Sequence, residues 1–179
     1  MEIHVVCRVG GVDTTVPSGK ETLSRSEHFQ KGVSTISTED NKALVRRAFE
    51  DLNQGSLGKA DEYFTPNFVF HDAANPQVSN SEEYMQFLTG LMAALPGQFT
   101  IEDMIAEGDK VVSRYTFRST HRGQWRGIPP TGKPVTITST ATYRFADGKV
   151  AEMWQNADTL GLLQQLGVIP SMWQASYSL

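Results

Sequence analysis

The second half of the chain contains four strand-like segments in a row, and this run limits the fold more than any other feature. Each segment is rich in β-branched and aromatic residues, as strands are. The segments cover residues 99–107, 110–121, 134–145 and 149–156. Short turns at Gly108-Asp109 and Asp147-Gly148 join the first pair and the last pair, and strands joined by such turns run antiparallel. The sequence therefore predicts an antiparallel sheet in this half.

Helical signals dominate the first half. Ser37 and Asp40 fit a capping box, with Asp in place of the usual Glu or Gln, and apolar residues then recur at helical spacing. The further elements expected are a short helix over 57–64, a strand over 67–71, a helix from Ser81 that stops at Pro96, and a closing helix over 159–166. The order ααβαββββα indicates the α+β class, with one curved sheet wrapped around the N-terminal helices.

Residues 1–36 differ from the rest because they are rich in Gly, Ser and Thr and show no sustained hydrophobic period. We interpret them as a disordered N-terminal extension, although IHVVCRV at its start also fits a short strand. Residues 37–179 then form a single α+β domain, which fits the total length of 179 residues.

Composition argues against several classes of protein. The net charge is −4 and no basic stripe is visible, which argues against a nucleic-acid partner. No apolar run approaches the roughly 18–20 residues of a membrane span, and the N-terminus lacks the pattern of a secretory signal. The single cysteine, Cys7, rules out an intrachain disulfide and fits a cytoplasmic location.

Metal and cofactor chemistry has little support in the sequence. His4 and His28 belong to the extension, which leaves His71 and His121 in the domain. Two histidines without a cysteine exclude a three-His or Cys-rich zinc site there, and a His/carboxylate site stays open. GxSxG, Walker and GxGxxG motifs are absent from the sequence. We therefore expect neither a bound metal nor a cofactor.

Four local motifs carry a family resemblance that spans roughly residues 38–170. They are Phe70-His71-Asp72, the stretch THRGQWRGIPPTG over 120–132, the turn DGKV over 147–150, and the ending DTLGLLQQLG over 158–167. With the element order, these motifs resemble the ester cyclase branch of the SnoaL-like polyketide cyclases, in the nuclear-transport-factor-2-like superfamily. The resemblance implies a cone-shaped domain with one deep apolar cavity and a homodimer packed through its sheet.

The resemblance also implies where catalytic groups would lie. In the characterised cyclases of this family, an acid on the last strand moves a proton during an intramolecular aldol closure. When the sequence is aligned through the turn at 147–149, that position falls on Gln155, and a histidine of the preceding strand falls on Ala141. What remains is a variant site, with the carboxylate of Asp158 three residues beyond Gln155.

Asp158 has two interpretations, and both remain open. As a general base at the cavity end of the last strand, it needs a pKa raised by an apolar pocket. As the N-cap of the closing helix, it accepts backbone N–H bonds, which weaken a carboxylate as a base. His121 is the second catalytic candidate, because strand alternation places it on the face of Tyr115 and Phe117. The alternative for His121 is a core histidine satisfied by its neighbours.

The remaining candidates would bind substrate. His71 and Asp72 are adjacent at a strand end, so at most one of them faces a cavity, and Asp72 also fits a turn. Gln155 suits a substrate carbonyl, because a primary amide both donates and accepts hydrogen bonds. The candidate wall residues are Trp125, Trp154, Tyr84, Phe87, Tyr115 and Met153. Plain core packing explains each of these wall residues as well.

The sequence thus favours a small cofactor-independent enzyme that acts on an apolar, oxygenated, polyketide- or terpenoid-like molecule by acid/base proton transfer. Cyclisation, isomerisation, dehydration and hydrolysis all fit this description. Two alternatives stay open. One is a non-catalytic protein that binds a hydrophobic small molecule in the same cavity, and the other is a domain that mainly assembles through its exposed sheet.

Overall fold

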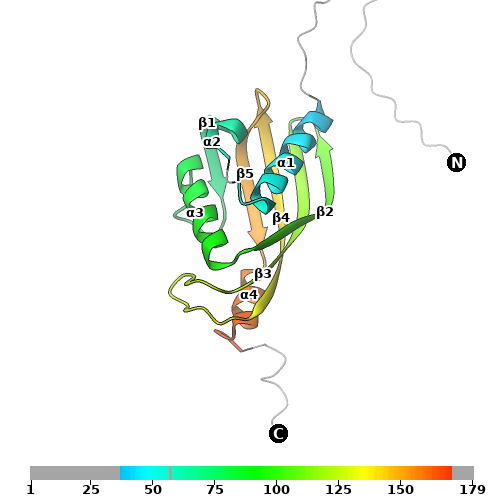
Figure 1. Cartoon of the computed structure of the whole chain (residues 1–179). Coiled ribbons are helices and arrows are strands. Elements are labelled where there is room, and N and C mark those ends of the chain that lie inside the picture. The colour runs from blue at the N-terminus through cyan, green and yellow to red at the C-terminus, as the bar shows by residue number, and fades with distance from the viewer. Residues whose placement is uncertain (1–36, 57, 171–179) are drawn as a thin grey trace, which may run out of the picture. The chain divides into compact units, whose positions relative to one another are not determined.

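The computed structural model describes residues 37–56 and 58–170, and Figure 1 shows how they are arranged. The elements are α1 (Thr38–Asn53), α2 (Ala60–Tyr63), β1 (Phe64–His71), α3 (Ser81–Ala94), β2 (Gly97–Glu107), β3 (Lys110–Thr120), β4 (Pro134–Ala146), β5 (Lys149–Ala157) and α4 (Thr159–Leu166). The predicted order ααβαββββα is confirmed. The extension and the short strand expected within residues 1–36 lie outside the described residues. Within the described ranges, no helix has the length and apolar character needed to cross a membrane.

The five strands form one curved, unclosed sheet in the order β1-β5-β4-β3-β2. Strands β2 to β5 pair antiparallel with their neighbours, as the turns at 108–109 and 147–148 predict. The edge strand β1 instead pairs parallel with β5, with His71 opposite Trp154, so the sheet is mixed rather than wholly antiparallel. No tight turn joins β1 to β5, and therefore no local signal in the sequence fixes their relative direction.

Strand β4 shows how the sheet separates its two faces. Val135, Ile137 and Tyr143 are buried, whereas the threonines between them are more exposed, which is the alternation of a strand with one covered face. Helices α1 and α3 lie on the buried side, α1 over β2 and β3 and α3 over β1 (Figure 1). The sheet therefore curves around the N-terminal helices, as the sequence predicts.

The core divides into two groups of packed side chains. One lies beneath α1 and α3 and includes Phe49 and Phe70. The other adjoins α4 and includes Phe117 and Leu162. Phe99 of β2 packs against both groups, and its ring centroid lies 4.3 Å from that of Phe117 and 5.7 Å from that of Phe49. The aromatic side chains of β2 and β3 thus join the two parts of the core.

The start of α1 shows the predicted capping box. The Ser37 hydroxyl accepts a hydrogen bond from the N–H of Asp40 at 3.1 Å, and the Asp40 carboxylate accepts one from the N–H of Ser37 at 2.9 Å. The second bond is the main reason why the pKa of Asp40 lies below its ordinary value. Asp therefore performs the part that Glu or Gln usually takes in this motif.

We predict that Phe70→Ala lowers the free energy of unfolding by about 3–5 kcal/mol, because it deletes a buried ring from the core. The Phe70 side chain is 3% exposed, whereas that of Ile105 is 69% exposed. The control Ile105→Ala should therefore cost less than about 1 kcal/mol. Urea denaturation measures both changes, and equal losses in the two variants would contradict the place of Phe70 in the core.

Candidate active site

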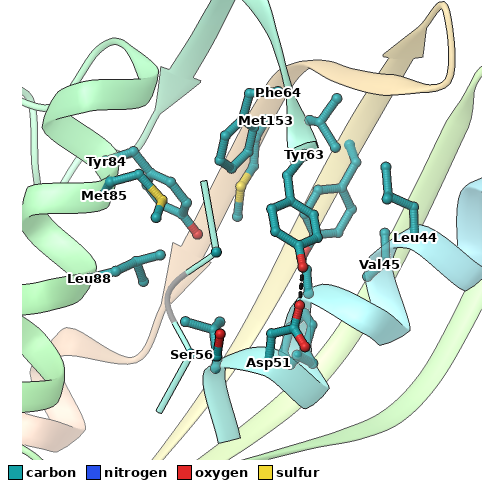
Figure 2. A pocket seen from close by; sticks show the side chains of 16 residues that line it. Leu44, Val45, Asp51, Ser56, Tyr63, Phe64, Tyr84, Met85, Leu88 and Met153 are labelled. Carbon is teal, nitrogen blue, oxygen red and sulfur yellow. Dashed lines mark hydrogen bonds between the residues drawn. The ribbon is translucent and has the colours of Figure 1, made fainter. Parts of the chain in front are cut away.

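The concave side of the sheet contains two hollows. The first lies between α1 and α3 and has a volume of about 70 Å³. Figure 2 shows its mostly apolar lining, with Leu44, Met85 and Met153 among the labelled side chains. Its one carboxylate among the described residues, Asp51, accepts a hydrogen bond from the Tyr63 hydroxyl. The first hollow has room for a few water molecules, far less than the roughly 300–1,000 Å³ of a small-molecule site.

The second hollow has a volume of about 340 Å³, which is within the range of small-molecule sites. It lies between α3, α4, strands β2 to β5, and the loops that follow β1 and β3. Aromatic rings from Phe87, Phe99, Phe117 and Trp125 form much of its wall. Among the described residues none lines both hollows, so the space expected as one cavity is divided. The second hollow is therefore the candidate active site.

Polar groups gather in the second hollow. They come from Asp72, Asn75, Tyr115, Arg126, Ser139, Gln155 and Thr159. Gln155 of β5 pairs with Ala141 of β4, so the two positions at which the resemblance implies an acid and a histidine lie side by side. Both positions carry uncharged side chains in this chain. The side-chain amide of Gln155 forms no hydrogen bond within the described residues, and the residue is half-buried, which leaves this amide available to a ligand.

Asp72 is the carboxylate that lines the second hollow in the described part of the chain. It follows β1 directly and is buried, with 9% of its surface exposed. One carboxylate oxygen accepts from the N–H of Ala74 at 2.8 Å, and the other accepts from the amide of Asn75 at 2.6 Å. Asp72 thus forms the predicted turn and also reaches the hollow. Each oxygen keeps a lone pair for a further partner.

Neighbouring side chains along a strand point to opposite faces, so at most one of His71 and Asp72 can face the hollow. His71 lies on the opposite face of the sheet from Asp72. Its ring stacks on Trp154 with centroids 5.2 Å apart, and its Nε2 lies 2.9 Å from Oε1 of Glu152. That contact is the largest cause that lowers the pKa of Glu152. His71 and Trp154 therefore lie outside both hollows. Trp154 is adjacent to Met153, so the two expected wall residues point to opposite faces.

Asp158 is the N-cap of α4. Its Oδ1 accepts a hydrogen bond from the N–H of Gly161 at 2.8 Å, and the residue is exposed and lines neither hollow. Gly161 packs so closely against this carboxylate that an added Cβ would lie 2.1 Å from Oδ2 of Asp158. No hydrogen bond joins Asp158 to His121 within residues 37–56 and 58–170. Asp158 therefore has the contacts of a helix cap and not the position of a base inside a cavity.

His121 is completely buried at the end of β3 and lines neither hollow. Its Nδ1 lies 3.1 Å from the Thr131 hydroxyl and accepts from the N–H of Thr131 at 3.3 Å. Its Nε2 has no hydrogen-bond partner among the described residues. Tyr115 and Phe117 share the buried face of β3, as the alternation predicts, and both line the second hollow, whereas His121 does not.

Of the other expected wall residues, Phe87, Trp125 and Tyr115 line the second hollow, whereas Tyr84 and Met153 line the first. Burial is the largest cause that raises the pKa of Tyr84 and Tyr115 above the ordinary value, and the charge of Asp72 adds to both rises. These phenols are therefore neutral at physiological pH. The neutral hydroxyl of Tyr115 is suited to donating a hydrogen bond inside the second hollow.

Sequence reasoning missed Asn75, Arg126 and Ser139. The Arg126 guanidinium donates through Nη2 to the carbonyl of Ala74 at 3.0 Å and to Oδ1 of Asn75. The Asn75 amide in turn donates to Asp72. The local signal for Ser139 is its buried place in the alternation of β4. Asn75 and Arg126 gave no such signal, because their roles depend on a contact between distant segments.

Helix α4 closes one side of the hollow and is attached to β4 by side chains. The Gln165 amide accepts from the N–H of Thr136 at 2.7 Å and donates to its carbonyl at 2.9 Å. The ammonium group of Lys133 donates to the carbonyl of Leu166 at the C-terminal end of the helix, at 3.0 Å. These contacts hold Leu162 and Leu163 against the hollow. The LGLLQQLG ending thus supplies both the wall and its attachment.

Comparison with known proteins identifies the family that this fold and hollow belong to. The family model for SnoaL-like polyketide cyclase matches residues 43–166, which is more than half of the chain. The chain belongs to the SnoaL-like polyketide cyclase family. The resemblance carried by the sequence motifs is thereby confirmed.

Individual relatives agree with this assignment. Aklanonic acid methyl ester cyclase DnrD of Streptomyces peucetius is 28% identical over 131 residues, which cover 69% of this chain and 88% of that protein. Among solved structures, AclR of Streptomyces galilaeus, a suggested hydroxylase, is 30% identical with a TM-score of 0.68 and covers 75% of this chain and 100% of its own. TsrD of Streptomyces laurentii is 25% identical with a TM-score of 0.68 and the same coverage.

We predict that Asp158→Ala lowers the free energy of unfolding by about 0.5–2 kcal/mol, because it removes the side-chain acceptor at the start of α4. Asp158→Asn is the matched control, since Asn caps helices about as well as Asp. Chemical denaturation of both variants tests this. If Asp158→Ala were as stable as the parent chain, the carboxylate would not stabilise the helix and the capping interpretation would fail.

Proposed function

We propose that the second hollow binds an apolar, oxygenated, polycyclic or terpenoid-like molecule, and that Asp72 moves a proton in a ring-closing step. The observation that carries the proposal is the position of Asp72, a buried carboxylate at an aromatic hollow of about 340 Å³. A carboxylate that accepts a carbon-bound proton must contact the substrate in a site with little water. The burial of Asp72 at the hollow supports this role, whereas Asp158 lies at an exposed helix end.

The proposed reaction is an intramolecular aldol closure. Asp72 takes a proton from a carbon next to a carbonyl group, and the resulting enolate attacks a second carbonyl carbon of the same molecule. The new carbon–carbon bond forms as that carbonyl oxygen becomes an alkoxide, and the alkoxide takes the proton back from Asp72. Tyr115 and Gln155 donate hydrogen bonds to the oxygens that gain charge. The step is neutral in electrons and needs no cofactor.

Relatives supply the first substrate to test. The curated relatives DnrD and DauD are named as cyclases of aklanonic acid methyl ester, and the family to which the chain belongs supports cyclase-type activity. Isomerisation and dehydration are further outcomes of the same initial proton transfer, whereas hydrolysis would require Asp72 to take a proton from a water molecule that attacks a carbonyl carbon. The aromatic walls of the hollow suit a flat substrate, because ring faces pack closely against such surfaces.

A second candidate function is binding without turnover. Gln155, rather than an acid, occupies the position at which the resemblance implies the proton-transfer group, and it faces the hollow. A neutral amide can hold a carbonyl group without moving a proton. This candidate keeps the same ligand class and the same hollow but gives Asp72 only the role of holding the turn after β1.

The test is Asp72→Asn with aklanonic acid methyl ester, followed by chromatography of the product. We expect turnover to fall by about 10²–10⁴-fold, because general acid–base catalysis contributes roughly that much, while the affinity for the substrate changes little. Asp109→Asn, at an exposed hairpin turn, is the control, and circular dichroism checks the fold of both variants. Undiminished turnover would exclude Asp72 as the base. Binding by the parent chain without any product would favour the second candidate.

We also propose the homodimer that the family resemblance implies. The face of the sheet opposite α1 and α3 carries Val69, which is 40% exposed, beside the stacked pair of His71 and Trp154. Apolar and aromatic side chains that lie next to one another on an exposed sheet face favour association. We expect light scattering of the full chain to give twice its mass of 19.8 kDa, and Val69→Lys to shift the species towards the single-chain mass. A single-chain mass for the parent protein at all concentrations would exclude the dimer.

A further inference from the structure

Asp72 and Arg126 are the two charged side chains that line the second hollow in the described part of the chain. The two are not in an ion pair with each other. Asn75 lies between them, since it accepts from Arg126 and donates to Asp72. Within the described residues Arg126 has no acidic partner. The hollow therefore presents a positive group whose charge the protein does not neutralise by direct contact.

The backbone holds Arg126 in an unusual conformation. Trp125 and Ile128 exchange two main-chain hydrogen bonds, at 3.0 and 2.8 Å, so Arg126 and Gly127 form a two-residue turn. Their φ values are +51° and +80°. Such turns favour Asn, Asp or Gly at the first position, because a larger side chain at positive φ is strained. The conformation of the turn therefore does not explain why an arginine occupies this position.

The guanidinium of Arg126 is also held in position. It lies over the Trp125 ring, with Cζ 5.6 Å from the ring centroid, and its Nη2 donates to Ala74 and Asn75. A guanidinium group has five N–H donors, so the N–H groups on Nε and Nη1 remain for another partner. A cation fixed in this way loses little conformational freedom when it binds a ligand.

We propose that the second hollow recognises a carboxylate group on its ligand through Arg126. This inference rests on the proposed function, since it takes the hollow as the site of an aromatic or polycyclic molecule, and it names the polar end of that molecule. The substrate named for the curated relatives is a methyl ester, so the inference assigns this chain a ligand with a free acid in place of the ester. The ring system packs between Trp125 and Phe117, and the carboxylate lies at the Arg126 side. Charge-assisted hydrogen bonds between guanidinium and carboxylate are the strongest polar contacts available at this hollow.

The competing explanation is that Arg126 only ties the loop after β3 to the turn after β1. Both explanations predict that Arg126→Gln changes the protein, so a loss of binding alone decides nothing. They differ over ligand charge. Loss of a structural tie weakens charged and uncharged ligands equally, whereas loss of a carboxylate receptor weakens the charged ligand more than the uncharged one.

The experiment compares two probes of nearly equal shape, anthraquinone-2-carboxylate and anthraquinone-2-carboxamide, by isothermal titration calorimetry at neutral pH. We expect the full chain to bind the carboxylate about tenfold or more tightly than the amide. Arg126→Gln should abolish this preference by weakening the carboxylate about tenfold or more beyond any change for the amide, and Arg126→Lys should keep part of it. Arg122→Gln is the matched control, because Arg122 is an exposed residue of the same loop and does not line the hollow.

Each other outcome has a definite meaning. If the parent chain binds both probes with one affinity, the inference is overturned and the proposed function stands. If Arg126→Gln weakens both probes equally, Arg126 is a structural tie and the inference is again overturned. If neither probe binds, the hollow does not take flat aromatic molecules, and the inference and the proposed ligand class fail together.

Discussion

The pairing register of β3 with β4 decides which of their side chains line the second hollow. Tyr115 pairs with Ser139 and Phe117 with Ile137, and all four side chains line the second hollow. Because side chains alternate along a strand, a slip of one residue would turn this whole set to the opposite face. One pattern of main-chain hydrogen bonds therefore positions both the hydroxyl groups and the aromatic rings of the site.

The loop between β3 and β4 preserves that register although it is too long for a tight hairpin turn. The N–H of His121 donates to the carbonyl of Lys133 at 2.9 Å, and the N–H of Gly132 donates to the carbonyl of His121 at 2.9 Å. The buried imidazole of His121 also bonds Thr131. These contacts hold the two ends of the loop together. The position of Trp125 at the hollow therefore depends on a loop whose ends are fixed.

Local signals in the sequence were sufficient for the order of the elements and for the capping box of α1. Alternation also separates Met153 from Trp154, so the same rule could have removed Trp154 from the expected wall. Contacts between distant segments could not be predicted, because no local pattern encodes them. Arg126 and Asn75 are 51 positions apart, and the direction of β1 beside β5 is equally non-local. The sequence left both a cap and a base open for Asp158 until the position of α4 relative to the hollow was known.

Gln165 has a consequence for how the hollow exchanges its contents with water. Its amide pairs with the N–H and the carbonyl of Thr136, as a residue of a neighbouring strand would. Helix α4 thus covers the end of β4 through side-chain contacts, apart from the main-chain bond from Asp158 to Thr138 at 3.0 Å. If α4 detached from β4, every main-chain hydrogen bond between the strands of the sheet would stay intact. Opening of α4 and opening of the sheet therefore have separate free energies. Hydrogen exchange at the N–H of Thr136 reports the opening of α4 alone.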